Sequence, residues 1–182
     1  MARYVALLGG INVGGHRVKM ETLRDVFSDL GFAHVSTFIA SGNVVFDAPN
    51  ADAEQLEQII EERLKQSLGY AVPTFLRTRS ELAAVVALSP FAPEEMETAG
   101  YTVHVGFLRD ALPVGAEHRI AAFQTERDAF CLYNRELYWL CRGKTTESLV
   151  AWPKLTKAVP LPALTLRNMT TVRKLVAAYP AE

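Results

Sequence analysis

The sequence lacks the long apolar runs that mark a membrane protein. Its longest runs, Tyr4 to Leu8 and Ala83 to Leu88, are far shorter than the roughly 20 residues that cross a bilayer. The amino terminus reaches Gly9 and Gly10 after only a few apolar residues, too few for the core of a secretory signal. We therefore expect a cytoplasmic protein with no membrane partner.

Charge of one sign is also missing, because 19 basic and 20 acidic residues give a net charge of −1. With 49% hydrophobic residues the chain has enough apolar surface to fold, which excludes disorder and predicts one sizeable core or two small ones. Basic residues are nevertheless concentrated toward the carboxyl end. This basic tail comprises Arg142, Lys144, Lys154, Lys157, Arg167, Arg173 and Lys174.

Cysteine is scarce, and the two present are badly placed for a disulfide. A hairpin turn predicted at 133–136 sets Cys131 opposite Tyr138 and Cys141 opposite Asp128. The two sulfurs would then be separated by three residues of strand, or roughly 10 Å, beyond the reach of a disulfide. Free thiols are predicted, as in a reducing compartment.

Motifs for common catalytic and metal sites are absent. The histidines show no metal-ligand spacing, so no metal site is predicted. There is no G-x-S-x-G elbow, and the glycines near the amino terminus lack G-x-G-x-x-G spacing. Gly143-Lys144-Thr145 follows a strand but has Tyr138 where a P-loop needs its first glycine. No catalytic residue or cofactor is predicted, and the sequence leaves open whether the protein is an enzyme.

The hydrophobic pattern of the first half predicts the order β-α-β-β-α-β. Pro73 cannot donate to a strand ladder, which suits the fourth strand because that strand lies at a sheet edge in this order. A capping signature at Thr78–Glu81 begins a further helix through Leu88. The predicted strands are 4–8, 35–39, 44–46 and 72–76, and the predicted helices are 20–30, 56–68 and 78–88.

The second half repeats this order. It has a strand at 102–108, a helix near 116–123, the hairpin, a helix after Thr146, a weak strand at 164–166 and a last helix at 169–179. The predicted fold class is therefore α+β, with two ferredoxin-like (βαββαβ-type) halves and antiparallel sheets. Residues 1–88 form the first half, 89–100 a linker and 101–182 the second half. The two halves share an order of elements but no sequence motif.

A glycine-rich segment, Gly9-Gly10-Ile11-Asn12-Val13-Gly14-Gly15-His16, separates the first strand from its helix. Glycines let backbone amides approach a ligand, and helix amino termini favour anions. In the predicted topology this loop and the turn after the second strand emerge at one end of the sheet. An alternative is that the glycines only shape a long connection. The residues placed near one ligand are Asn12, Gly14, Gly15, Lys19, Ser41 and Asn43.

Two residues near the carboxyl end extend this hypothesis. Asn168 is placed to cap the last helix and Arg167 to face an anion near the same terminus, although a plain cap beside a solvated arginine is the alternative. The favoured function is binding of a small anionic or phosphorylated ligand. The alternatives are nucleic-acid binding through the basic tail and an interaction scaffold without a small ligand.

Comparison with RNA-recognition modules gives little support. The predicted third strand carries one aromatic residue, Phe46, and no basic residue, so Tyr4 and Phe46 are expected to pack in a core.

The chain resembles the family named domain of unknown function 1697. The resemblance is carried by Leu7-Leu8-Gly9-Gly10-Ile11-Asn12-Val13-Gly14-Gly15, by Ser41-Gly42-Asn43-Val44 and, near the end, by a T-x-R-N-W-N-T-V-x-K-L pattern from Thr165 to Leu175. It implies an α+β protein of two ferredoxin-like halves and no established activity. This chain departs from the family pattern at Gly9, where arginine is usual, and at Met169 and Thr170, which replace tryptophan and asparagine.

Overall fold

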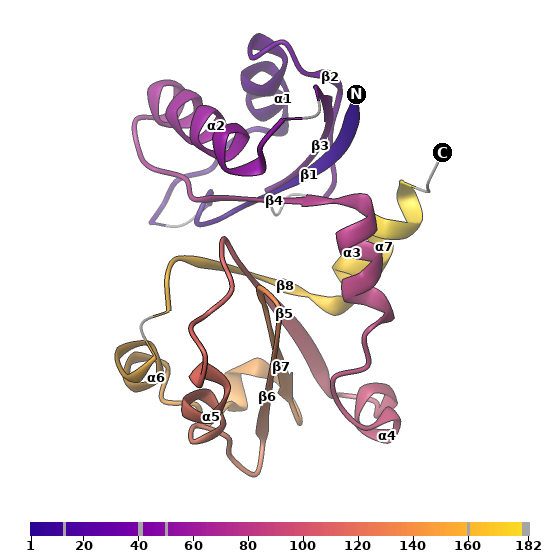
Figure 1. The fold of residues 1–182 in the computed structure, drawn as a ribbon, viewed down its shortest axis with the longest axis vertical. Coiled ribbons are helices and arrows are strands. Elements are labelled where there is room, and N and C mark those ends of the chain that lie inside the picture. Colours follow the sequence, from indigo (N-terminus) through magenta and orange to yellow (C-terminus); the bar gives the residue numbers. More distant parts are fainter. Residues whose placement is uncertain (13, 40–41, 50, 160, 180–182) are drawn as a thin grey trace. The chain divides into compact units, whose positions relative to one another are not determined.

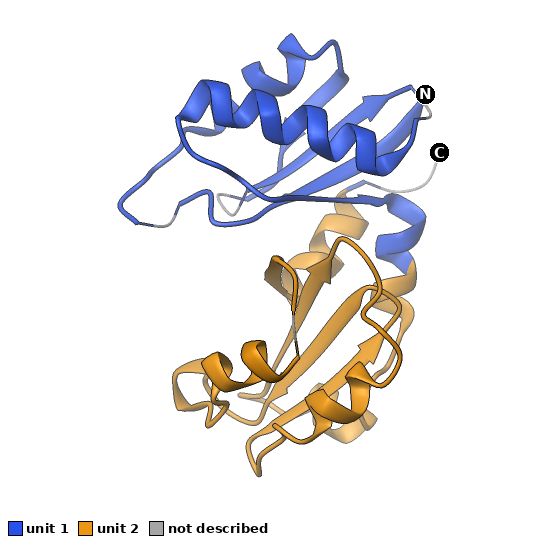
Figure 2. Ribbon diagram, turned by 60° about the vertical axis from the view of Figure 1, so that its left-hand side comes forward, with its two compact units in different colours: residues 1–83, 179–182 blue, residues 84–178 orange. Residues whose placement is uncertain are grey.

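The computed structural model describes residues 1–12, 14–39, 42–49, 51–159 and 161–179. Its contacts divide the chain into two units (Figure 2). Unit 1 comprises Met1–Ala83 together with Tyr179–Glu182, and unit 2 comprises Ala84–Ala178.

Unit 1 is a four-stranded antiparallel sheet with two helices against one face (Figure 1). The strand order β2-β3-β1-β4 is that of a ferredoxin-like fold, as predicted. Its elements are β1 (Ala2–Leu8), α1 (Met20–Asp29), β2 (Ala33–Thr37), β3 (Asn43–Ala48), α2 (Ala53–Leu68) and β4 (Thr74–Thr78).

The core of unit 1 lies between the sheet and α1 and α2. Alternate residues of β1 face this core, and the Tyr4 ring stacks on Phe46 with centroids 5.9 Å apart. Phe27 of α1 meets the Phe46 ring edge-on at 5.2 Å. Tyr4 and Phe46 are therefore core residues, as expected, and are not a surface for base stacking.

A capping carboxylate and a glycine set the two ends of the α2 helix. Asp52 accepts a hydrogen bond from the Glu54 amide at 2.8 Å, and Gly69 ends the helix in the left-handed conformation at φ 83°.

Glutamate side chains accept hydrogen bonds from the outward amides of the edge strand β4. Glu61 Oε1 accepts from the Thr74 amide at 2.8 Å, and Glu57 Oε1, which is buried, accepts from the Leu76 amide at 2.7 Å. Glu81 Oε2 accepts from Thr78 N at 2.7 Å. Alternate outward amides of the strand thus point at carboxylates, which prevents another strand from pairing there.

Unit 2 repeats the architecture of unit 1 with the strand order β6-β7-β5-β8. Its sheet carries a core cluster that includes Phe130, Trp139 and Leu155, against which Trp152 packs. Its elements are α4 (Pro93–Glu97), β5 (Thr102–Leu108), α5 (Ala116–Ala121), β6 (Asp128–Tyr133), β7 (Glu136–Cys141), the 3-10 turn η1 (Thr145–Glu147), α6 (Trp152–Ala158), β8 (Leu164–Asn168) and α7 (Met169–Ala178).

The hairpin of β6 and β7 confirms the predicted pairing. Cys131 lies opposite Tyr138 and Cys141 opposite Asp128, and both thiols are free. Burial raises the pKa of each thiol, so neither is a reactive thiolate at neutral pH.

Buried Asp128 organises the end of this hairpin. Its carboxylate accepts four hydrogen bonds, from Trp139 Nε1 (2.9 Å), Ser148 Oγ (2.8 Å), Thr125 Oγ1 (2.8 Å) and the Leu149 amide (2.9 Å). These bonds join three loop or strand segments through one buried charge.

The remaining helix, α3 (Arg79–Ala87), follows β4 and begins with the predicted cap, in which Thr78 Oγ1 accepts from Glu81 N at 3.2 Å. The two units divide within this helix, between Ala83 and Ala84. The segment 89–100, predicted as a linker, contains the short helix α4.

The end of the chain returns to unit 1 through Tyr179. Its hydroxyl lies 3.1 Å from Ser36 Oγ, its carbonyl accepts from Arg79 Nε at 2.5 Å, and its ring meets Phe38 edge-on. Within the described ranges, no helix combines the length and apolar character needed to span a bilayer.

Candidate functional site

The glycine loop, defined here as residues 9–19, meets the β2–β3 turn at one end of the sheet of unit 1. Both β1 and β2 run antiparallel to β3, so the carboxyl ends of β1 and β2 lie at the same end of the sheet. The Leu8 amide donates to the Gly42 carbonyl at 2.8 Å, and the Gly9 amide donates to the Pro73 carbonyl at 2.7 Å. The last residue of β1 is thus tied to the turn, and the first residue of the loop to the segment before β4.

Hydrocarbon occupies the junction between the loop and the turn. Ile11 is 4% exposed, and a Cβ placed on Gly42 would lie 2.8 Å from its Cγ2. Asn43 is fully buried and its Nδ2 donates to the Phe38 carbonyl at 3.0 Å. Asn43 therefore supports the turn from inside, and Ser41 lies outside the described residues. Among the described residues, Ile11 and Asn43 are buried at this junction, whereas the outer part of the loop, residues 12 and 14–19, is largely exposed.

The outer part of the loop is held closed by side chains. Asn12 Oδ1 accepts from the Val18 amide at 3.1 Å. Tyr70 Oη donates to the Ile11 carbonyl at 2.9 Å, and the Tyr70 ring stacks on His16 with centroids 4.2 Å apart. Gly14, at φ 69°, and Gly15, at φ 86°, supply the left-handed conformations that this path needs.

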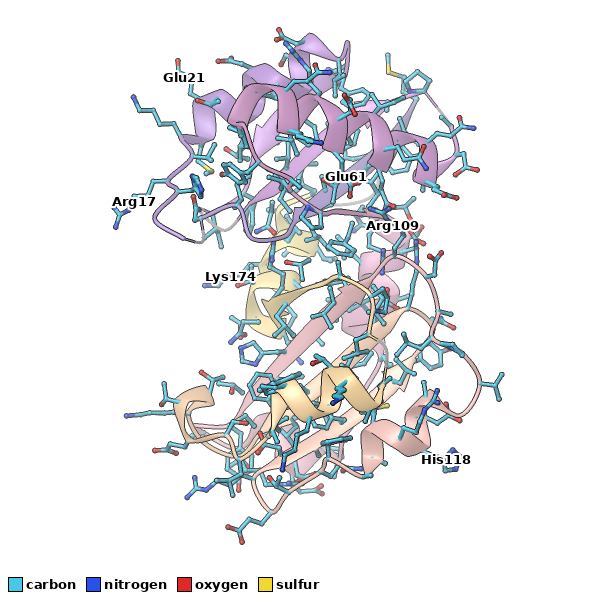
Figure 3. The ribbon with its side chains drawn as sticks, turned by 90° about the vertical axis from the view of Figure 1, so that its left-hand side faces the viewer. Arg17, Glu21, Glu61, Arg109, His118 and Lys174 are labelled. Atoms are coloured by element: carbon cyan, nitrogen blue, oxygen red, sulfur yellow. The ribbon has the colours of Figure 1, made fainter. Side chains whose placement is uncertain are left out.

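Positive charge gathers where the loop enters α1. His16, Arg17 and Lys19 are exposed, and Arg17 projects outward from the loop (Figure 3). Lys19 is the N-cap residue of α1, and its side chain makes no capping hydrogen bond. The first amides of a helix have no acceptor within it, so this terminus offers donors and a favourable dipole next to cations. Glu21 in the first turn is the opposing charge.

The structure separates the roles of Arg167 and Asn168. Asn168 Oδ1 accepts from the Thr170 amide at 2.8 Å and so caps α7, as predicted. Arg167 is not the solvated side chain of the alternative, because it is 7% exposed and its Nη1 donates to Thr165 Oγ1 at 2.7 Å and to the Leu166 carbonyl at 2.9 Å. Burial lowers the pKa of Arg167 to about 10. The alternation of β8 places its side chain inside.

Burial and pairing also change the interpretation of the basic tail. Arg167 is buried, and Arg142 is paired, because its Nε donates to Glu95 Oε1 at 2.6 Å. Lys154, Lys157, Arg173 and Lys174 are exposed. Nucleic-acid binding by the tail remains a prediction with fewer available charges than the sequence implied.

Two half-buried residues that the sequence motifs did not single out each have one buried polar side-chain atom without a hydrogen bond. Within the described part of the chain, Thr102 Oγ1 and His104 Nδ1 have no partner. They lie two residues apart on one face of β5, and the His104 ring lies 5.1 Å from that of Trp139. Burial lowers the pKa of His104. The available sequence signal was their alternation with Val103 and Val105, which puts two polar residues on a helix-covered face.

A small polar hollow adjoins Thr102 at the start of α7, within unit 2. It has a volume of about 80 Å³, and Asn168, Thr170 and Arg173 line it together with Thr102. In the portion of the chain that the structure describes, histidine, cysteine and carboxylate side chains form no cluster that could hold a metal ion.

These observations define an α+β protein built from two ferredoxin-like units. The chain belongs to the family described as protein of unknown function (DUF1697), whose model matches residues 1–138. The solved structure of the conserved bacterial protein SP0830 from Streptococcus pneumoniae is similar, with a TM-score of 0.77, 22% sequence identity and 98% of each chain covered. At that identity the likeness shows the fold alone. No curated protein matches the sequence.

Proposed function

We propose that this protein binds a small phosphorylated or otherwise anionic molecule on the outer part of the glycine loop. The observation that carries the proposal is the hydrogen bond from the Val18 amide to Asn12 Oδ1, at 3.1 Å. It closes the loop so that Arg17 and Lys19 stand beside the uncapped amino terminus of α1. Positive side chains and unused amides then face the same region of solvent.

Several described residues of the loop and its flanks are held by hydrogen bonds or ring stacking, which favours binding. Gly9 is tied to Pro73, the preceding Leu8 of β1 is tied to Gly42, and Tyr70 contacts Ile11 and His16. A loop fixed in this way loses little conformational freedom on binding, so more of the interaction energy appears as affinity.

The position of the proposed ligand differs from that expected at first. Because Ile11 fills the junction with the turn, Asn43 does not contact the ligand, and Arg167 belongs to the other unit, on β8. The proposed contacts are the backbone at Gly14 and Gly15, the first amides of α1, and the side chains of Arg17 and Lys19. A phosphate group suits these donors because it offers several strong acceptor oxygens.

The test is a calorimetric titration of the full chain with inorganic phosphate and with nucleotide and sugar monophosphates at constant ionic strength. Arg17→Gln and Lys19→Gln should each weaken binding by roughly tenfold, the range expected for one charge-assisted hydrogen bond. Asn12→Ala should weaken it as well, although no charge is lost, because the loop is no longer closed. Lys65→Gln removes the same charge from an exposed position on α2 and should have no effect.

Two results would contradict the proposal. Binding that is unchanged in Arg17→Gln and Lys19→Gln would exclude the loop. An equal loss in Lys65→Gln would show only a general response to net charge. A parallel titration with a short oligonucleotide at low salt tests the nucleic-acid alternative, whose affinity should fall steeply as salt is raised.

A further inference from the structure

The ring of His16 is a feature of the glycine loop that the proposed phosphate contacts do not use. It stacks on the ring of Tyr70, with centroids 4.2 Å apart and an angle of 26° between the planes. Tyr70 is itself held, because its hydroxyl donates to the Ile11 carbonyl at 2.9 Å. The position of the His16 ring is thus set by a tyrosine that is bonded to the same loop.

The second face of the His16 ring is open to solvent. His16 is an exposed residue although Tyr70 covers one face of its ring. The exposure of the ring therefore comes from its opposite face and its edge. Gly14 lies beside the ring, since a Cβ added there would be 3.9 Å from His16 Cδ2. Because neither Gly14 nor Gly15 has a side chain, these two residues leave the ring uncovered.

The ring and the cations of the loop follow one another closely along the chain. Arg17 is adjacent to His16 and projects into solvent (Figure 3). Lys19, the N-cap residue of α1, comes three residues after His16, at most about 10 Å along the backbone. A ligand that stacks on His16 and reaches this terminus therefore needs a short spacer between its ring and its anionic group.

These requirements describe a nucleotide. Its base is a flat aromatic ring, its phosphate is the anion, and its ribose separates the two. Every base has a π-face, so bases of any kind stack on aromatic side chains, histidine included. His16 is the only aromatic residue among residues 9–19, so the loop provides a platform for one base rather than for a strand of nucleic acid.

We infer that the ligand of the glycine loop is a mononucleotide, with its base stacked on His16 and its phosphate bound by Arg17, Lys19 and the amino terminus of α1. The inference rests on the proposed function, since it names the class of the same anionic ligand. Tyr70 is a positioning residue, which orients the ring of His16. Because Tyr70 holds this ring, stacking of a base costs little side-chain entropy.

The test compares two ligands of the full chain by calorimetric titration at constant ionic strength. They are adenosine monophosphate and the corresponding ribose phosphate, which lacks the base. Both carry the same phosphate on the same sugar, so the ratio of their affinities measures the contribution of the base. The wild type should bind adenosine monophosphate roughly tenfold more tightly, as expected for the stacking of one base on an aromatic side chain.

Variants of His16 should change this ratio. His16→Ala should reduce the ratio to about one, whereas His16→Phe keeps an aromatic ring and should retain most of it. A change in the phosphate contacts alters both affinities together, so the ratio isolates the base. His118→Ala is the control, because it removes an exposed histidine from α5 in unit 2 and should leave the ratio unchanged.

Nuclear magnetic resonance separates stacking from a general change in the loop. The ring protons of His16 should shift upfield when adenosine monophosphate is added, because a stacked base shields them. Ribose phosphate should produce no such shift. The same small shift with both ligands would show that the base does not lie on the ring and would overturn the inference.

Failure of this inference and failure of the proposed function give different results. If both ligands bind with equal affinity and Lys19→Gln weakens both, the loop binds phosphate but His16 binds no base. If neither ligand binds and inorganic phosphate does not bind either, the inference and the proposed function are both wrong.

Two further results would overturn the inference alone. The first is a ratio that is unchanged in His16→Ala or is lowered equally in His118→Ala. The second is a single-stranded oligoadenylate that binds many times more tightly than adenosine monophosphate, which would identify nucleic acid as the ligand instead.

Discussion

Arg77 and Arg167 occupy the same position in the two sheets. Arg77 lies opposite Val5 in the ladder of β1 and β4, and Arg167 lies opposite Val105 in the ladder of β5 and β8. Both side chains are buried, at 1% and 7% exposure, and each Nη1 donates to the carbonyl of the preceding leucine, at 2.8 and 2.9 Å. Each arginine comes just before the strand's last residue and the following helix, α3 or α7.

Because both guanidinium groups are buried and hydrogen-bonded, neither position should tolerate loss of the side chain. Arg77→Ala and Arg167→Ala should each lower the free energy of unfolding by about 2–4 kcal/mol. Lysine should not restore it, since an ammonium lacks the planar arrangement of donors. Urea unfolding measures the effect, and exposed Arg173→Ala serves as the control. A loss of less than about 1 kcal/mol would show that these arginines are not structural.

Glu57 should be the most important of the carboxylates that close the edge of β4. Glu57→Ala removes the acceptor of the buried Leu76 amide and should destabilise the protein by about 2–3 kcal/mol. It should also increase aggregation, because an edge strand with free amides can pair with another chain. Glu57→Gln keeps an acceptor oxygen and should retain most of the stability. Exposed Glu62→Ala is the control, and unfolding combined with light scattering measures both effects.

The contact between Gly42 and the glycine loop can be tested with alanine. At φ 72° an alanine is strained, and its Cβ would also lie 2.8 Å from Ile11 Cγ2. Gly31, at φ 80°, has the same conformational requirement, but a Cβ there would meet no atom within 4 Å. Gly31→Ala should therefore cost about 1 kcal/mol, and Gly42→Ala at least about 1 kcal/mol more. Urea unfolding measures both losses. Equal losses of unfolding free energy in the two variants would mean that Ile11 moves aside at no energetic cost.

Asp128 should govern part of the response to acid. Burial by itself would raise the pKa of this carboxyl, but hydrogen bonds from Leu149, Trp139, Ser148 and Thr125 outweigh it, and the pKa is lowered. A carboxyl with a lowered pKa stabilises the folded state above its unfolded pKa of about 3.9, and this contribution is lost as the pH falls through the lower folded value.

The matching variant is Asp128→Asn, whose amide sets donors against donors. It should lose about 2–4 kcal/mol at pH 7 and show a shallower fall in stability between about pH 5 and pH 3. Urea unfolding across this range measures both quantities. If the free energy of unfolding of Asp128→Asn falls with decreasing pH as steeply as that of the wild type, other carboxyls cause the pH dependence.

Periodicity and turn residues were enough to predict the order of the elements. The edge position of β4, the free cysteines and the helix cap at Thr78 followed from local chemistry, which the sequence displays directly. The sequence match between the two halves, Leu76-Arg77-Thr78 and Leu166-Arg167-Asn168, is too short to identify from the sequence alone, since only the Leu-Arg pair is identical. The ladder registers align them, and registers depend on pairing across the sheet.

The candidate site was harder to predict, because burial decides which polar groups are available. Asn43 and Arg167 belong to residue types that usually face solvent, yet neighbouring strands enclose both. Thr102 gives the opposite case, since a strand threonine is ordinary in sequence, yet its Oγ1 is buried without a partner among the described residues.

The docking of Tyr179 has a consequence for how the protein can be divided. Its contacts with Ser36, Phe38 and Arg79 place Tyr179 in the same body as the first sheet, with residues 84–178 inserted between them in the sequence. A fragment cut after the first sheet would therefore lack an aromatic side chain that packs on its own body.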